Sequence, residues 1–333
     1  ENLGTIKIYD YTNDWNEIRQ IDNVEFTGKI SFSPDDNWIL VGNNNYNNYT
    51  GNLVVYNIDL NFTMGNNSMT GDNSYSFWGQ FYDISNSNIG DYTIAGGAYG
   101  ESGLVKIFYY DQNDELFYQM GSNLNNENTY DGFGYSVSLS NDGSIIAIGA
   151  PGDSDELSIN DPLTKGYVKI YEYINNEWSL KGQKLEGENS GDFFGNIVKL
   201  SSDGLKLAVT LNNQVNIYEF VNDTWIKINF VYYENISYIS LSENADILNA
   251  STNSEIKTFS LSVSDSPRLK LSLTPNSKGE TTIDVSASDN EVSITNSFNV
   301  IVFRENELPV FDSAPVTIAY EIYYMSIMFK FQM

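Results

Sequence analysis

The chain has 333 residues, of which 41% are hydrophobic and 14% aromatic, so it has enough apolar material for a packed core and is not globally disordered. Its formal net charge of -27 excludes proteins that hold nucleic acid or anionic membranes through basic patches. His and Cys are both absent, which removes disulfides, the Ser-His-Asp and Cys-His nucleophile systems and the usual zinc sites.

A short phrase recurs along the chain, a glycine followed by an alternating strand of the type Gly-x-Val-Lys-Ile-Tyr. Clear copies begin at Gly4, Gly51, Gly103 and Gly166, and weaker copies begin at Asn213 and Ser254. Successive copies are roughly 40–60 residues apart, and repeats of about this length with several short strands per unit are typical of β-propeller blades.

The best-preserved unit, residues 131–187, predicts four strands in chain order. An alternating stretch over 136–140 and an Asn-Asp-Gly turn come before a β-branched run over 145–148, which is typical of a strand buried on both faces. The phrase at Gly166 gives the third strand, and the fourth carries Trp178. The same order recurs elsewhere, so we predict an all-β protein with a propeller of four-stranded blades. About five blades are visible, and about five to seven are compatible with the pattern.

Two further features repeat in step with the strands. Each fourth strand carries an aromatic residue, and an aromatic-glycine pair opens most units. We interpret both as structural, because an aromatic ring can wedge between blades and glycine permits close backbone approach. The fourth-strand aromatics are Trp15, Phe62, Phe117, Trp178 and Trp225, and the pairs are Trp78-Gly79, Phe133-Gly134 and Phe194-Gly195.

The phrases over 133–143 (FGYSVSLSNDG) and 146–151 (IAIGAP), with their spacing to 166–171 (GYVKIY), resemble the FG-GAP repeat. This is the repeat of integrin α-chain propellers and of many bacterial and viral surface proteins. The resemblance covers residues 1–262 and implies a β-propeller that binds macromolecules or glycans outside the cell. One departure is the connection between the first two strands, Ser140–Ser144, which is too short to form the Ca²⁺ loop of integrin-type repeats. Those sites therefore do not carry over.

The pattern changes near residue 264. Alternating stretches over 269–273, 283–287 and 298–302 predict a small, partial β-sandwich over 264–311. Residues 297–302 and 305–311 resemble the end and linker of cadherin-like or Ig-like adhesin repeats, and 312–333 is interpreted as the start of a further module or an irregular tail. The late apolar run 322–329 is far shorter than the ~20 residues that cross a bilayer, so no membrane insertion is predicted.

Two groups of oxygen-bearing side chains are candidate Ca²⁺ ligands. One lies in an insertion that lengthens the third unit, for which the alternative is a solvated surface loop because EF-hand spacing is missing. The other is implied by the cadherin-like resemblance, in which Ca²⁺ binds between tandem modules. The first group is Asp153, Asp155, Glu156, Asn160 and Asp161, and the second is Asp289, Glu305, Asn306 and Glu307.

No carboxylate pair or other catalytic constellation stands out, so catalysis is not predicted. Residues 43–49 (NNNYNNY) and Phe77-Trp78 are candidate glycan-binding positions, with a low-complexity loop and blade packing as the alternatives. We interpret the chain as part of a longer secreted, cell-surface or virion-surface protein, because it starts in mid-pattern at Glu1. The expected function is adhesion to a protein or glycan partner. The alternative is a scaffold or accessory domain of a larger secreted enzyme, such as a glycoside hydrolase, or of a virion protein.

Overall fold

The computed structural model describes residues 4–11, 14–24, 30–43, 46–58, 63–71, 78–87, 91–99, 102–111, 113, 115–152, 161–261, 279–288 and 293–302. The chain divides into two compact units, Glu1–Ser262 and Val263–Met333. Over the described ranges, no helix has the length and apolar character needed to cross a membrane.

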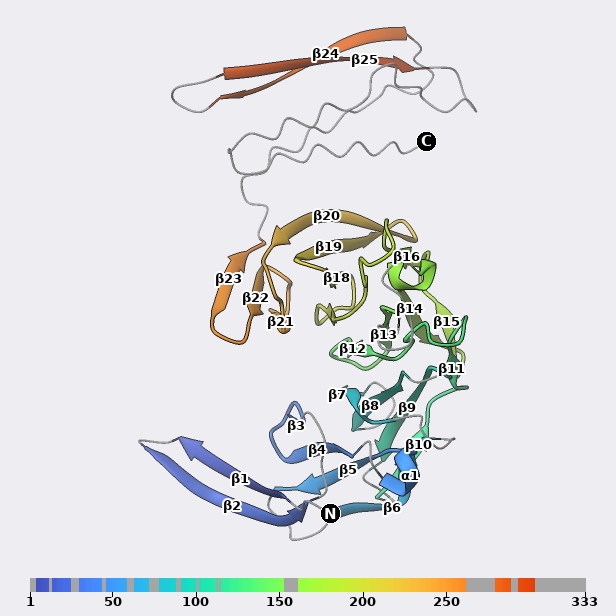
Figure 1. Ribbon diagram of the computed structural model, residues 1–333, viewed down its shortest axis with the longest axis vertical. Helices are drawn as coiled ribbons and strands as arrows, with labels where there is room; N and C mark the ends of the chain where they lie inside the picture. The colour runs from blue at the N-terminus through green and yellow to red at the C-terminus, as the bar shows by residue number, and fades with distance from the viewer. Residues whose placement is uncertain are drawn as a thin grey trace. The chain divides into compact units, whose positions relative to one another are not determined.

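In the first unit, successive antiparallel sheets form five blades, and a two-stranded hairpin precedes them (Figure 1). The hairpin is β1 (Gly4–Tyr11) and β2 (Trp15–Val24). Blade 1 is β3 (Ile30–Phe32), β4 (Trp38–Asn43), β5 (Asn52–Asn57) and β6 (Thr63–Thr70), with the short helix α1 (Tyr46–Tyr49) between β4 and β5. Blade 2 is β7 (Phe81–Asn86), β8 (Tyr92–Ala98), β9 (Leu104–Asp111) and β10 (Leu116–Gln119), with β11 (Leu124–Asn125) also paired to β9.

The remaining blades repeat this order. Blade 3 is β12 (Ser136–Leu139), β13 (Ile145–Ala150), β14 (Tyr167–Ile174) and β15 (Glu177–Leu180), with the 3-10 helix η1 (Pro162–Lys165) before β14 and β16 (Leu185–Glu186) paired to it. Blade 4 is β17 (Val198–Leu200), β18 (Lys206–Leu211), β19 (Gln214–Val221) and β20 (Thr224–Tyr232). Blade 5 has three strands, β21 (Tyr238–Leu241), β22 (Ile247–Ser251) and β23 (Ile256–Ser260). The prediction of an all-β chain with a five-bladed propeller arrangement is confirmed.

The core lies between the blades. At each junction, apolar residues of one third strand pack against the second strand of the blade that follows; Val105 and Ile107 of β9, for example, share a cluster with Ile146 of β13. We call the surface that a blade turns to its successor its outgoing face, and the surface turned to its predecessor its incoming face. The second strands are therefore buried on both sides, as the fully buried β8 and β13 are.

The aromatic-glycine pairs lie at these junctions, as predicted. Trp78 and Phe133 are 0% exposed and Phe194 is 1% exposed. Gly134 has a φ of 92° and donates its N–H to the Gly149 carbonyl at 3.1 Å. A Cβ on Gly149 would lie 2.0 Å from the Gly195 carbonyl oxygen of blade 4. The glycines are needed because the backbones of neighbouring blades touch here.

The turns between first and second strands are also structural, as predicted. Ser140 donates to Asp142 Oδ1 at 2.7 Å, and its Oγ accepts the N–H of Ile145 at 2.9 Å. Adjacent turns are joined through the backbone, since Asn141 N–H reaches the Ser202 carbonyl at 2.9 Å and Ser202 N–H reaches Glu243 at 2.8 Å. The Asp142 carboxylate is therefore a hydrogen-bond acceptor within a tight turn rather than a reactive group.

In the second unit, the described residues form one antiparallel hairpin, β24 (Gly279–Ser288) with β25 (Ser293–Val302). Two of the alternating stretches predicted as strands lie in it, while the stretch 269–273 lies outside the described residues. The β-sandwich module and its likeness to cadherin-like or Ig-like repeats stay predictions.

Candidate functional site

Three aromatic rings from two blades meet at one end of the propeller. Phe81 begins β7, Tyr99 follows the last residue of β8, and Tyr135 directly precedes β12. The ring centroids are 4.4 Å apart for Phe81 and Tyr135, and Tyr99 lies 5.5 Å from each of them. All three side chains are half-buried, so part of each ring is accessible to solvent. We call these three residues the aromatic cluster.

The loop that delivers Tyr135 is anchored by a buried carboxylate. Asp131, 1% exposed, accepts the backbone N–H groups of Glu127, Asn128 and Phe133, each at 3.0 Å. Its Oδ2 also accepts the hydroxyl of Tyr167 at 2.7 Å, which ties the loop to β14. Because Tyr135 lies four positions further along, the same contacts fix where its ring enters the aromatic cluster.

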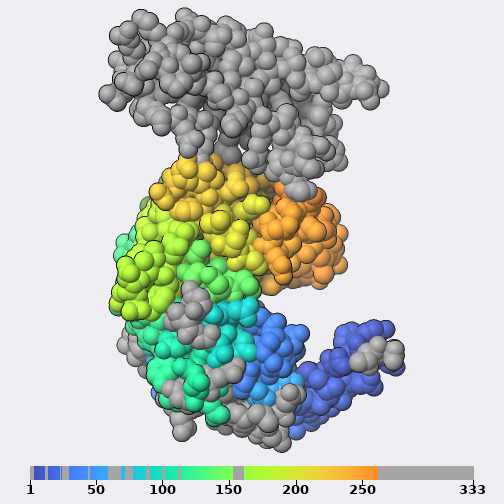
Figure 2. Space-filling model, turned by 180° about the vertical axis from the view of Figure 1, so that it is seen from behind, coloured from blue at the N-terminus to red at the C-terminus, as the bar shows by residue number. Residues whose placement is uncertain are grey.

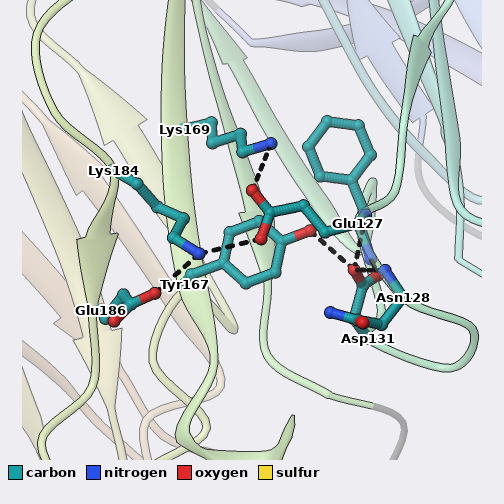
Figure 3. A network of polar contacts seen from close by, with 8 residues as sticks. Glu127, Asn128, Asp131, Tyr167, Lys169, Lys184 and Glu186 are labelled. Atoms are coloured by element: carbon teal, nitrogen blue, oxygen red, sulfur yellow. Dashed lines mark hydrogen bonds and ion pairs between the residues drawn. The ribbon is translucent and has the colours of Figure 1, made fainter.

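A second attachment holds the start of this loop (Figure 3). The Glu127 carboxylate is bound by Lys169 Nζ at 2.7 Å and by Lys184 Nζ at 2.8 Å, and Lys184 also reaches Glu186 at 2.7 Å. Lys184 Nζ lies 5.1 Å from the centre of the Tyr167 ring, a cation–π distance. We call Glu127, Lys169 and Lys184 the Glu127 clamp. It joins the loop before blade 3 to the third strand of blade 3 and to the segment that follows β15.

The pKa shifts of these residues fit a structural role. The hydrogen bonds from Lys169 and then Lys184 hold the pKa of Glu127 below its ordinary value. Burial, and then the Asp131 carboxylate, raise the pKa of the Tyr167 hydroxyl well above its ordinary range, so it stays a hydrogen-bond donor at neutral pH. Both shifts move the pKa away from neutrality, which favours positioning over acid–base chemistry for Glu127 and Tyr167.

A polar hollow of about 180 Å³ lies among the turns of the first strands, at the opposite end of those strands from the aromatic cluster. Two of its serine hydroxyls already have acceptors, since Ser140 and Ser201 each donate to the aspartate of their own turn. Its polar lining is Ser85, Ser140, Asn141, Ser201, Ser202, Ser242 and Glu243.

The predicted glycan-binding positions differ in how exposed they are to solvent. Trp78 is completely buried between blades 1 and 2 and is not available to a ligand, so the blade-packing alternative is the correct one for this residue. In the stretch 43–49, Asn43 is buried whereas Tyr46 and Tyr49 are 39% and 41% exposed in α1. Phe77 and residues 44–45 lie outside the described residues.

Most predicted Ca²⁺ ligands lie outside the described residues, namely Asp153, Asp155, Glu156, Asn160, Asp289, Glu305, Asn306 and Glu307. Asp161 is described, and its Oδ1 accepts the N–H of Leu163 at 2.9 Å as the N-cap of η1. Over the part of the chain that the structure describes, no three acidic side chains are grouped to hold a metal ion. The Ca²⁺ sites stay a prediction.

Sequence reasoning did not identify the aromatic cluster, although a signal was present. Tyr135 directly follows the aromatic-glycine pair of blade 3, and the corresponding residues of blades 2 and 4 are Gln80 and Asn196. Aligning the repeats at this position would have shown that blade 3 has a tyrosine where blades 2 and 4 have amide side chains. Its two partners could not be inferred in this way, because they come from the neighbouring blade.

Comparison with known proteins supports the fold directly. The family model for the FG-GAP repeat matches residues 125–167, which include the Asp131 loop and Tyr135. No curated protein shows significant sequence similarity to the chain. A crystal structure of a functionally unknown protein from Desulfotomaculum acetoxidans is similar with a TM-score of 0.55 and 16% identity, over 78% of this chain and 76% of that one. That likeness concerns the fold alone. The chain carries an FG-GAP repeat within a five-bladed β-propeller arrangement.

Proposed function

We propose that this propeller is a non-catalytic binding module that recognises a protein or glycan partner through the aromatic cluster. The observation that carries the proposal is the meeting of Phe81, Tyr99 and Tyr135 at one blade junction, each ring partly exposed. Tyrosine combines a flat apolar ring with a hydroxyl, a combination suited to surfaces that must bind in water.

The way the cluster is held supports the same role. Half-exposed rings on a mobile loop would lose conformational entropy on binding, whereas Asp131 and the Glu127 clamp fix the Tyr135 loop beforehand. A fold of this repeat family is compatible with adhesion. An extracellular or surface location belongs to the proposal, because a binding module of this kind would meet its partner there.

The test is a screen of the whole chain against a glycan array and against immobilised cell-surface protein fractions, followed by titration of any ligand found. Tyr135→Ala should raise Kd at least tenfold, about 1.4 kcal/mol. The matched control is Tyr118→Ala, because Tyr118 is 37% exposed, stacks on Tyr109 and lies on β10 outside the cluster. Equal losses in both variants would refute the cluster as the site.

The second candidate is a scaffold or accessory domain within a larger secreted enzyme or virion protein. It is favoured by the Asp131 hydrogen bonds and the Glu127 clamp, which rigidify the propeller whether or not a ligand binds. Under this alternative the screen returns no ligand, and Tyr135→Ala lowers stability without changing any interaction. Binding that depends on Tyr135 in a variant that remains folded would decide against it.

A further inference from the structure

Three successive blade junctions share one residue position at the end of the propeller that carries the aromatic cluster. Blades 2, 3 and 4 lie next to one another in chain order, from cyan through green to yellow in Figure 2. The residue directly after the aromatic-glycine pair is Gln80 at the junction of blades 1 and 2, Tyr135 at the next junction and Asn196 at the junction of blades 3 and 4. We call these three residues the junction row.

The spacing within the junction row is fixed by the glycine that precedes each member. Gly79 donates its N–H to the Gly97 carbonyl at 3.1 Å, and a Cβ on Gly97 would lie 2.1 Å from the Gly134 carbonyl oxygen. The same closeness recurs one junction further, where the Ser136 hydroxyl donates to the Gly195 carbonyl at 2.7 Å. The junction row therefore stands on a continuous line of touching backbone and is arranged before any ligand binds.

The middle of the junction row is aromatic. The ring centroids of Tyr135 and Phe81 are 4.4 Å apart and Tyr99 lies 5.5 Å from both, so the rings fill the space between them. A ligand must therefore lie across the rings, whereas the anchor residues of protein partners fill pockets. The C–H face of a sugar ring suits such a surface, because it is apolar while the hydroxyl groups at its edge stay free to form hydrogen bonds.

The two ends of the junction row are amides. Gln80 directly precedes Phe81, and the backbone of Asn196 is held by an N–H donated to the Phe193 carbonyl at 3.2 Å. Both amide side chains are half-buried. An amide carries donors and an acceptor side by side, so it matches a sugar hydroxyl, which both donates and accepts, without introducing a charge.

The charged groups that hold the Tyr135 loop are paired with one another. Asp131 is buried and accepts four hydrogen bonds, and the Glu127 carboxylate binds both lysines of the Glu127 clamp. Those lysines are thus committed to a carboxylate of the chain itself rather than to the carboxylate or sulfate of an acidic sugar. The net charge of -27 also disfavours an anionic ligand, so the surroundings favour a neutral one.

We propose that the junction row binds a neutral oligosaccharide that extends across the three junctions. One sugar ring lies on the aromatic cluster, and hydroxyl groups of the sugars on either side bond to Gln80 and Asn196. This inference rests on the proposed function, narrows its ligand to an uncharged glycan and adds two residues to the site. Recognition then depends on the number of linked sugars, because a single sugar reaches only the middle of the row.

The test is isothermal titration calorimetry of the whole chain with cello-, malto- and N-acetylchito-oligosaccharides of about one to six units, and with oligogalacturonides as the anionic comparison. At least one neutral series should bind with a Kd that falls about tenfold or more from the shortest to the longest oligomer, and the anionic series should bind more weakly. Gln80→Ala and Asn196→Ala should each raise the Kd of the longest oligomer about threefold or more and leave that of the shortest unchanged. The matched control is Asn141→Ala, an exposed amide in the turn at the opposite end of blade 3, which should change neither value.

The outcomes separate this inference from the proposed function. If no neutral oligosaccharide binds, the inference is wrong, and a protein partner bound through Tyr135 would then leave the proposed function standing. An affinity that is independent of length, or that Gln80→Ala and Asn196→Ala leave unchanged, would also overturn the inference, as would tighter binding of the oligogalacturonides. Oligosaccharide binding that Tyr135→Ala does not weaken would refute the aromatic cluster as the site and the proposed function with it.

Discussion

Replacing Asp131 tests how the loop that carries Tyr135 is held. The carboxylate accepts four hydrogen bonds, and Asp131→Ala leaves their donors without this acceptor. The N–H groups of Glu127 and Asn128 are partly accessible, so water replaces the lost bonds at small cost. Phe133 N–H and the Tyr167 hydroxyl are buried, and an unmade buried bond costs about 1–3 kcal/mol. We therefore expect a loss of about 3–5 kcal/mol in the free energy of unfolding.

Blade 4 supplies the control. Asp192 occupies the same repeat position, and among the described residues it accepts the N–H groups of Glu188 and Asn189 alone, at 2.9 and 2.8 Å in an exposed loop. Gln214 stands where blade 3 has Tyr167. Asp192→Ala should therefore cost about 1 kcal/mol.

The assay is urea unfolding followed by tryptophan fluorescence, with midpoints compared at constant m value. In a double-mutant cycle, Tyr167→Phe should cost less in the Asp131→Ala background than in wild type, because the two residues share one bond. The reasoning is refuted if Asp131→Ala is no more destabilising than Asp192→Ala, or if the cycle is additive.

Substitutions at three further positions have definite expected outcomes. The folded-state pKa of Glu127 is lowered, so its stabilisation is present above the unfolded value near 4.5 and is lost as pH falls through the folded pKa. The Tm advantage of wild type over Glu127→Gln at about pH 7 should thus shrink as the pH falls below 4.5, and a gap constant with pH would contradict this. Trp78→Phe removes a buried Nε1–H that has no acceptor among the described residues and introduces the residue that blades 3 and 4 use there. It should change stability by less than about 1 kcal/mol by urea unfolding, while Trp78→Ala costs about 3–5 kcal/mol. Asp36 is exposed, has a φ of 59° and occupies the turn position that is glycine in blades 3 and 4. Asp36→Gly should therefore raise the free energy of unfolding by about 0.5–1 kcal/mol in the same assay. A decrease would show that the Asp36 side chain stabilises the turn.

The sequence predicted the blades because their determinants are local and repeated. Strand alternation, the Ser140–Asp142 turn and the aromatic-glycine pairs each fall within a few residues, and five copies in the same order leave one architecture. Trp15 marks the limit of this reasoning. Its position predicted the same structural role as Trp178 and Trp225, yet it is 68% exposed because burial depends on the preceding blade and not on the local pattern.

The site could not be predicted for the same reason. Glu127 meets Lys184, 57 residues further along the chain, and Phe81 meets Tyr135 across a blade junction. Such contacts depend on how two blades face each other, which a single repeat does not encode. Of the two interpretations of Trp78, blade packing is the correct one, because the aromatic residue before glycine is buried between blades in every blade where it is described.

The two ends of the strands differ in how much sequence variation they tolerate, which supports the place of the proposed binding surface. At the turn end, the first–second strand connections of blades 3, 4 and 5 are a few residues long and are hydrogen-bonded in series, Asn141 to Ser202 and Ser202 to Glu243. An insertion there would break contacts with two blades at once. At the other end, the Asp131 loop is longer and is fixed by the Asp131 side chain, so its other residues can change without breaking these bonds. The aromatic cluster lies at this second end, where a new recognition surface can arise at the least cost to the fold.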